Sequence, residues 1–245
     1  MLTFATLSKV GSRDINEDSH ELAQSGRMHL FTVADGLGGH GKGEVASAIA
    51  VRTVRSVICD GDVQALNEAV DAAIMQAQQK ILEEQARQHA ARDMKTTIVA
   101  LCMDEDNVCW GHVGDSRLYA FAKNKVKERT LDHSIPQMLA LSGEIPERKI
   151  RNHPQRNMLL RVLGIEWDRP RHEVSEVKPI SEYQAFLLCS DGFWELIREK
   201  EMCRLLKKSK TVQQWLDQMT RLVEKNGRGR EMDNYTAIAV WTNSL

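Results

Sequence analysis

The stretch Val33-Ala-Asp-Gly-Leu-Gly-Gly-His40 joins two segments of different character. The apolar residues 28–34 are typical of a buried strand, and residues 43–59, rich in Ala and Val, are typical of a helix. An aspartate at the end of a central strand projects its carboxylate from a rigid edge, and glycines behind it let a ligand or metal ion approach the backbone. The alternative, that Asp35 only caps the helix after a turn, stays open on this stretch alone.

The spacing of apolar residues predicts helices and strands along the rest of the chain. Residues 63–91 give the clearest helix, with apolar side chains on one face and polar ones on the other. Short apolar runs with tight polar turns predict an antiparallel meander over residues 97–130. The order of elements favours an α+β fold of two packed antiparallel sheets with helix pairs outside, and it leaves the layer order open. We expect strands at 2–10, 28–34, 97–103, 108–113, 117–122, 125–130, 184–190 and 235–241, and helices at 44–59, 63–91, 135–142, 193–208 and 211–226.

The composition is that of an ordinary globular protein. The 245 residues are 42% hydrophobic and 27% charged, with no repeat or linker, so we expect one domain at 1–245. The 33 basic and 34 acidic residues nearly balance, so nothing points to nucleic acid or an anionic membrane as a partner. No apolar run of about 18 residues predicts a membrane span. Five scattered cysteines without a C-x-x-C pair predict reduced thiols in a cytosolic protein.

Aspartates recur where the predicted strands begin or end. Asp35 and Asp191 end apolar strands, Asp115 follows another, and Asp233 precedes the last one. Together they predict carboxylates gathered at one edge of a sheet, and the acidic residues at 17–18 could join them. Such carboxylates repel one another unless a cation neutralises them, and oxygen ligands favour Mg²⁺ or Mn²⁺ over Zn²⁺.

Seven short motifs follow one another along the chain. They are Arg13-x-x-Asn-Glu-Asp18, Asp35-Gly-x-Gly-Gly39, Thr96-Thr97, Gly114-Asp-Ser-Arg117, Asp132-His-Ser134, Ser190-Asp-Gly192 with Trp194, and Asp233-Asn-x-Thr236. In order and rough spacing they resemble the metal-dependent Ser/Thr protein phosphatases of the type 2C (PPM) family. The resemblance spans about residues 4–241, and the compact length and the Leu after Asp35-Gly36 are similar to the bacterial branch.

The resemblance implies a fold and a reaction. The fold would be a central antiparallel β-sandwich flanked by pairs of α-helices. Two divalent ions, Mn²⁺ or Mg²⁺, would activate a bridging water that attacks the phosphoryl group of phosphoserine or phosphothreonine in line, with no phosphoenzyme. The partner would be a phosphorylated protein, and the enzyme would oppose a Ser/Thr kinase.

The resemblance also implies roles for single residues. Asp35 would bridge the two metal ions, and the carbonyl of Gly36 would bind one of them. Asp191 and Asp233 would complete the shell of the first ion. Arg13 would grip the substrate phosphate through a charge-assisted contact.

Three further carboxylates receive supporting roles by the same resemblance. Glu17 would act on the second ion through water, with Asp18 as support. Asp115, together with Asp191, would hold a third and weaker metal ion.

One position departs from the wider family. Relatives outside bacteria often carry His directly after the first Asp-Gly, where it is a candidate general acid, and this chain has Leu37 there. The group that protonates the leaving oxygen therefore stays open between a metal-bound water and another group such as His40. We expect His133 to pack at the sheet edge rather than to act in catalysis.

The insert at about residues 135–170 would be the family's flap beside the active site. Its basic residues either form a solvated loop or help to bind the phosphorylated partner, and the sequence leaves both open. They are Arg148, Lys149, Arg151, Arg156 and Arg161.

Two other functions compete with a protein phosphatase. One is a phosphoesterase acting on small molecules, and the other is a catalytically silent relative that only binds phosphoproteins. A silent relative would be expected to lack a metal carboxylate, whereas Asp35, Asp191 and Asp233 are all present. We expect a cytoplasmic bacterial signalling enzyme that works as a monomer.

Overall fold

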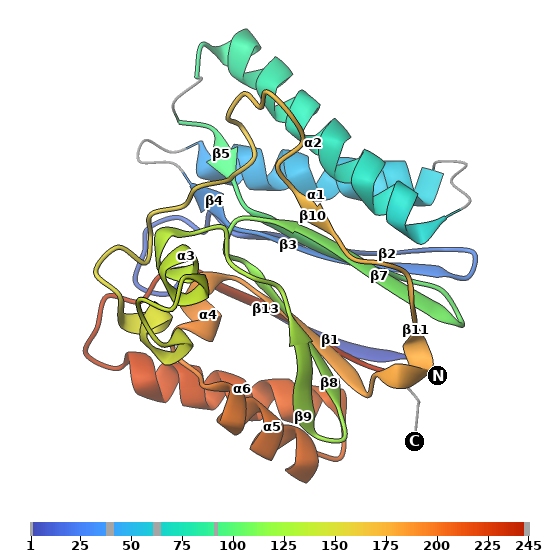
Figure 1. Ribbon diagram of the computed structural model, residues 1–245, viewed down its shortest axis with the longest axis vertical. Helices are drawn as coiled ribbons and strands as arrows, with labels where there is room; N and C mark the ends of the chain where they lie inside the picture. The colour runs from blue at the N-terminus through green and yellow to red at the C-terminus, as the bar shows by residue number, and fades with distance from the viewer. Residues whose placement is uncertain (1, 38–41, 61–64, 91–92, 243–245) are drawn as a thin grey trace.

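Two antiparallel sheets pack face to face in the computed structural model, which describes residues 2–37, 42–60, 65–90 and 93–242. Figure 1 shows the layers: α1 (Gly43–Asp60) and α2 (Leu66–Gln88) cover one sheet, and α5 (Glu199–Lys208) and α6 (Val212–Gly227) cover the other. The expected α+β sandwich with flanking helix pairs is confirmed, and the layer order is now defined.

The sheet beside α5 and α6 has five strands in the order β1-β13-β12-β8-β9. Because the first and last strands pair, the loop after β1 lies next to the segment that precedes β13. The bounds are β1 (Thr3–Lys9), β8 (Arg117–Ala122), β9 (Lys125–Arg129), β12 (Ala185–Cys189) and β13 (Tyr235–Trp241).

The sheet beside α1 and α2 has the order β10-β7-β6-β3-β2, and β11 also pairs with β7. Its strands are β2 (Ser19–Ser25), β3 (Met28–Ala34), β6 (Ile98–Met103), β7 (Asn107–Val113), β10 (Glu173–Val174) and β11 (Lys178–Pro179). A short ladder joins β4 (Gly36–Leu37) to β5 (Lys95–Thr96), directly after the end of β3.

Apolar side chains fill the space between the sheets and beneath each helix pair. Phe31, Leu101 and Leu188 lie between the sheets and are at most 2% exposed. Ile74 and Ile81 lie on the predicted apolar face of α2 and are fully buried against the sheet. Burial of one such side chain contributes about 1.5–3 kcal/mol, so the sandwich gives the strand ends a rigid base.

Two local expectations are wrong, and one strand was missed. The strands over residues 97–130 do not form one meander, because β6 and β7 belong to one sheet and β8 and β9 to the other. The predicted helix at 193–208 is two helices, α4 (Asp191–Trp194) and α5, because Arg198 is extended and its N–H is capped by Glu201 Oε2 at 3.1 Å. Strand β2 was not expected, since its residues are all only partly buried or exposed and show no apolar alternation.

The segment predicted as a flap, residues 135–170, follows β9 and returns past the short strand β5; it is called the flap below. It contains α3 (Ile135–Leu141) and the 3₁₀-helix η1 (Glu147–Asn152), and a second 3₁₀-helix, η2 (Ile180–Glu182), precedes β12. Leu163 and Thr96 exchange two backbone hydrogen bonds of 2.9 and 3.2 Å, which fasten the returning leg beside the end of β3. None of the helices within the described ranges combines the length and hydropathy needed to span a bilayer.

Candidate functional site

The loop that follows β1 is held against β13 by one asparagine. The Asn234 amide donates to the carbonyls of Val10 and Ile15 at 2.8 and 3.0 Å, and its Oδ1 accepts from the Glu17 N–H at 2.8 Å. Asn234 is buried, so this contact set fixes the path of the loop. It brings Arg13 and Glu17 to the strand ends.

Asp35 directly follows β3, and two threonines fix its backbone. Its carbonyl accepts from Thr96 Oγ1 at 2.8 Å and from the Thr97 N–H at 2.9 Å, while its own N–H donates to Thr97 Oγ1 at 3.0 Å. The next residue must be glycine, since a β-carbon on Gly36 would lie 2.4 Å from the backbone of Gly43. The start of α1 therefore packs directly against the residue that follows Asp35.

Asp191 and Asp233 come from adjacent strands of the other sheet. Asp191 opens α4 just after β12, and Asp233 precedes β13, which pairs with β12. Ser190 ties the two segments to the first loop, because its Oγ accepts from the Thr236 N–H at 3.0 Å and donates to Asp18 Oδ2 at 2.7 Å.

The residues predicted for the site converge on one pocket of about 250 Å³. Asp18 is the exception: it lies behind the wall with 8% exposure. A larger hollow of about 520 Å³ adjoins the pocket and shares several of its residues. The predicted residues that line the pocket are Arg13, Glu17, Asp35, Gly36, Asp115, Asp191 and Asp233.

The carboxylates of this cluster raise one another's pKa values. Burial, followed by the charge of Asp191, raises the pKa of both Asp35 and Asp115 well above the usual range. Burial and Asp233 raise the pKa of Asp191 to about 6. Burial raises the pKa of Asp18 to about 7, against the hydrogen bond from Ser190. The cluster thus retains protons near neutral pH that a bound cation would displace.

The donor set fits a hard divalent cation. The carboxylates and the Gly36 carbonyl offer only oxygen, which is what Mg²⁺ and Mn²⁺ prefer. Among the described residues, no group donates to the buried Oδ1 of Asp18, so this oxygen has an acceptor capacity that the protein itself does not satisfy.

Arg13 lies at the mouth of the pocket. Its Nη2 donates to Asp233 Oδ2 at 2.7 Å, and its side chain is 60% exposed. The hydrogen bond and charge of Asp233 raise the pKa of Arg13, which keeps it cationic. A guanidinium has five N–H donors, so an anion at the mouth can share this group with Asp233.

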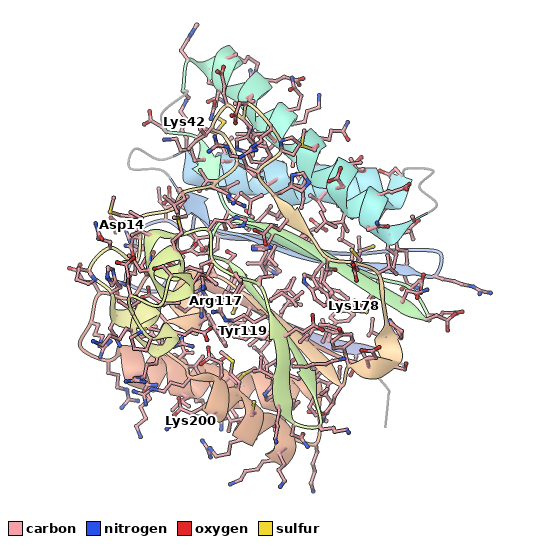
Figure 2. All side chains as sticks on the ribbon, in the orientation of Figure 1. Asp14, Lys42, Arg117, Tyr119, Lys178 and Lys200 are labelled. Atoms are coloured by element: carbon pink, nitrogen blue, oxygen red, sulfur yellow. The ribbon has the colours of Figure 1, made fainter. Side chains whose placement is uncertain are left out.

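A buried ion pair supports the helix that carries Asp191. Arg117 donates from Nε and Nη2 to both oxygens of Asp132 at 2.7 and 2.6 Å, and its Nη1 donates to the Tyr119 hydroxyl at 2.9 Å. Figure 2 shows Arg117 and Tyr119 near each other in the interior. The guanidinium lies 3.4 Å over the ring of Trp194, which shares α4 with Asp191.

The structure bears on the predicted partner-binding role of the basic flap residues and on the position of Leu37. Of the five basic flap residues, only Arg148 and Lys149 are freely exposed on η1, so a partner-binding role stays a prediction mainly for these two. The others form ion pairs: Arg151 with Glu199, Arg156 with Glu195, and Arg161 with Glu173. Leu37 lines the pocket, whereas His40 lies outside the described residues.

Sequence reasoning missed the polar residues that hold the carboxylates in place. Thr97, Ser190 and Asn234 stand inside the motifs quoted above, where they served only as markers of a resemblance. A Ser or Asn directly beside an aspartate was the available signal. Their roles depend on partners 62 to 224 positions away in the chain, which no local pattern reveals.

Comparisons with known proteins agree with this geometry. The family described as Protein phosphatase 2C matches residues 8–235. The serine/threonine phosphatase stp of Listeria innocua is 32% identical over 239 residues, covering 95% of this chain and 92% of that protein. The crystal structure of Stp1 from Staphylococcus aureus has a TM-score of 0.89 at 29% identity, covering 99% of this chain and 96% of that one.

A further solved structure contains metal. The catalytic domain of the phosphatase PstP, in complex with two manganese ions, has a TM-score of 0.79 at 25% identity, covering 98% of this chain and 97% of that one. The family match spans most of the chain, and the relatives match it nearly end to end. The chain therefore belongs to the protein phosphatase 2C family of serine/threonine phosphatases.

Proposed function

We propose that this protein hydrolyses phosphoserine and phosphothreonine in phosphorylated proteins with the help of divalent metal ions. The observation that carries the proposal is the convergence of carboxylates from five separate segments, together with Arg13, on one pocket. The printed names of the relatives support the substrate class. The two manganese ions of PstP support Mn²⁺ or Mg²⁺ as the metal.

Four groups would hold the two principal ions. Asp35 would bridge them, Asp191 and Asp233 would complete the shell of one, and the Gly36 carbonyl would bind one of them. When bound, the ions supply a hydroxide nucleophile from water at neutral pH. The buried pair Arg117–Asp132 packs against Trp194 and so supports α4, the helix that carries Asp191.

The remaining carboxylates would act around this centre. Glu17 lines the pocket and would act on the second ion through water. Asp18 lies behind the wall and would support the cluster through its hydrogen bond with Ser190. Asp115 and Asp191 would hold a third, weaker ion.

Arg13 would bind the phosphoryl oxygens and orient the ester bond. It is cationic, exposed at the mouth, and anchored to Asp233 at 2.7 Å, so it can turn its other N–H groups to an anion with little loss of side-chain entropy. Leu37, which also lines the pocket, has no proton to give, so the proton for the leaving serine or threonine oxygen comes from solvent or another group.

We also propose a setting for this activity. The enzyme would reverse the action of a Ser/Thr kinase in the bacterial cytoplasm, as a monomer, and would not require nucleic acid or a membrane. The free cysteines in the described part of the chain suit a reducing compartment, and the near-balanced charge gives no general attraction to polyanions.

The test is hydrolysis of a phosphothreonine peptide by the purified protein with Mn²⁺, with Mg²⁺ and with EDTA, next to Asp233→Ala. We expect metal-dependent turnover that the substitution lowers at least about a hundredfold, because a metal ligand is lost. Turnover that survives EDTA and Asp233→Ala would show that the carboxylates are not the catalyst. A folded protein that binds the peptide without turnover would be a silent phosphoprotein-binding relative, and activity on small aryl phosphates alone would indicate a small-molecule phosphoesterase.

A further inference from the structure

The turn that carries Asp115 is held by two buried side chains from outside it. Gly114 has a φ of +100°, and a β-carbon there would lie 2.5 Å from Thr97 Cγ2. The Gly114 N–H donates to His133 Nδ1 at 3.2 Å, and Trp194 Nε1 donates to the Asp115 carbonyl at 3.0 Å. His133 and Trp194 are 6% and 2% exposed, so water hardly competes for either contact.

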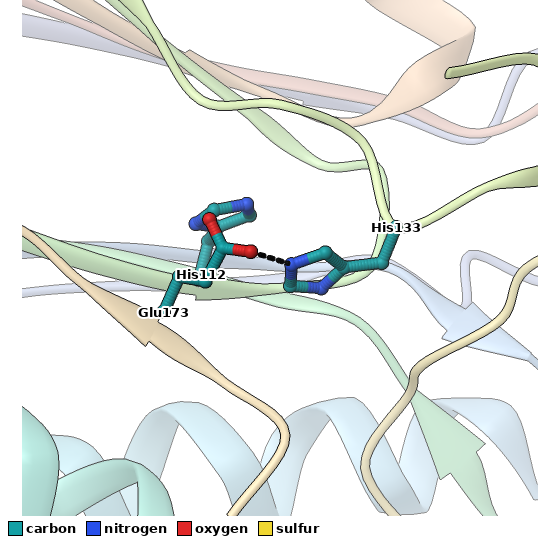
Figure 3. A group of neighbouring side chains, drawn as sticks. All are labelled: His112, His133 and Glu173. Carbon is teal, nitrogen blue, oxygen red and sulfur yellow. Dashed lines mark hydrogen bonds and ion pairs between the residues drawn. The ribbon is translucent and has the colours of Figure 1, made fainter. Parts of the chain in front are cut away.

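The imidazole of His133 is engaged at both of its nitrogens. Because Nδ1 accepts a hydrogen bond, Nε2 carries the proton, and it donates to Glu173 Oε1 at 3.2 Å (Figure 3). The main-chain N–H of His133 also donates to the Gly114 carbonyl at 2.9 Å, so the two residues exchange hydrogen bonds. Arg161 of the flap donates to the same Glu173 oxygen at 3.2 Å.

The group His112, His133 and Glu173 does not suit a metal ion, although ligand atoms of the three lie within 4.8 Å of one another. His112 Nε2 donates to the Leu131 carbonyl at 2.8 Å, and both nitrogens of His133 are occupied. The two rings are stacked, with centroids 4.6 Å apart and planes at 19°, so their in-plane lone pairs cannot converge on one ion.

The stacked partner instead holds the ring of His133 in place. Burial lowers the pKa of His112 to about 4, so His112 is neutral near pH 7 and does not repel its neighbour. The register of β10 with β7 places Glu173 opposite His112, directly beside the stack. His112 therefore fixes the orientation of the His133 ring by stacking, and Glu173 fixes its tautomer by accepting from Nε2.

We propose that His133 is a positioning residue for the Asp115 carboxylate: its Nδ1 atom fixes the Gly114–Asp115 turn, and Glu173 selects the tautomer that makes this contact. The inference rests on the proposed function where it takes Asp115 as a ligand of the weaker third ion. Groups that orient a metal ligand commonly change metal affinity by about 10- to 100-fold when they are removed. Arg161 of the flap also contacts Glu173, so the flap is connected to the same turn through Glu173 and His133.

Two amide substitutions separate the contacts of the imidazole. His133→Asn keeps an acceptor near the Nδ1 position and loses the contact to Glu173, whereas His133→Gln carries its amide near the Nε2 position and loses the acceptor for Gly114. We would measure amide hydrogen exchange at Gly114 by NMR in the metal-free protein, and Mn²⁺ binding by calorimetry. For His133→Gln we expect Gly114 exchange about fivefold faster, as the loss of one hydrogen bond implies, and Mn²⁺ affinity at the weaker site about tenfold lower.

We expect His133→Asn to stay within about twofold of the wild-type protein in both measurements, because its acceptor remains. Equal changes in the two variants would overturn the proposal, since they would reflect lost packing rather than a lost acceptor. Wild-type values for His133→Gln in both measurements would also overturn it.

Asp115→Asn tests separately whether Asp115 is a metal ligand, which the proposed function assumes. If Asp115→Asn leaves Mn²⁺ binding unchanged, the ligand role of Asp115 is wrong, and the proposal falls with it even if Gly114 exchange responds to His133→Gln. If Asp115→Asn weakens the third site and His133→Gln does so while His133→Asn does not, both the ligand role and the positioning role are supported.

Discussion

Replacing Asp191 by Asn should stabilise the metal-free protein while it abolishes turnover. Burial and the charge of Asp233 raise the pKa of Asp191 to about 6 from an ordinary 3.8, which corresponds to about 3 kcal/mol of unfavourable free energy for the charged form. Asp191 lines an open pocket where water screens part of this repulsion, so we expect a gain of about 1–2 kcal/mol at pH 8. An Asn can still accept a hydrogen bond at the same place but carries no charge.

The gain should depend on pH in a defined direction. Because the folded-state pKa is the higher one, the folded protein binds more protons than the unfolded chain between about pH 4 and 6. The penalty from Asp191 is therefore absent below about pH 4, grows as the pH rises through 6, and is complete above it. The advantage of the variant over the wild-type protein should follow the same course.

Urea denaturation of EDTA-treated protein at pH 4.5, 6 and 8 would measure this difference. Asp106→Asn is the matched control, since it makes the same change in charge at an exposed turn and should shift the free energy of unfolding by less than about 0.5 kcal/mol. Excess Mn²⁺ should stabilise the wild-type protein more than Asp191→Asn. An Asp191→Asn protein that is no more stable than wild type at pH 8, or a gain that does not change with pH, would refute the electrostatic reasoning.

Two further predictions concern residues around the pocket. Asp132→Asn should lower the free energy of unfolding by about 3–5 kcal/mol in urea denaturation, because it leaves the buried Arg117 with only the more distant Glu199 as a charged partner; a loss below about 1 kcal/mol would contradict this. Joint replacement of Arg148 and Lys149 by Ala should raise KM for a phosphoprotein by about two- to tenfold and leave a small aryl phosphate unaffected, and equal losses on both substrates would argue against a docking role. Arg151 is better left intact, since its ion pair with Glu199 makes it part of the folded structure.

Local patterns in the sequence predicted most of the elements. Apolar runs located β3, β12 and β13, and one apolar face located α2, because burial on one side of a strand or helix leaves a periodic trace in the chain. The positions of Asp35, Asp191 and Asp233 at strand borders followed from the same patterns. The ordered motifs then added the family, which the comparisons confirmed.

Only the tertiary structure decided which strands pair. Strands β6, β7 and β8 are buried on both faces, so they show no alternation that would tell one sheet from the other, and the expected meander was wrong. Likewise, Arg151 and Arg148 look alike in the sequence, yet one is paired with Glu199 and the other is exposed. The sequence by itself determined where the carboxylates stand along the chain, because propensity and burial are local. The carboxylates gather into one pocket only once the sheets have packed, because this depends on contacts between distant segments. The hydrogen bonds by which Asn234, Ser190 and His133 hold the surrounding backbone depend on the same contacts.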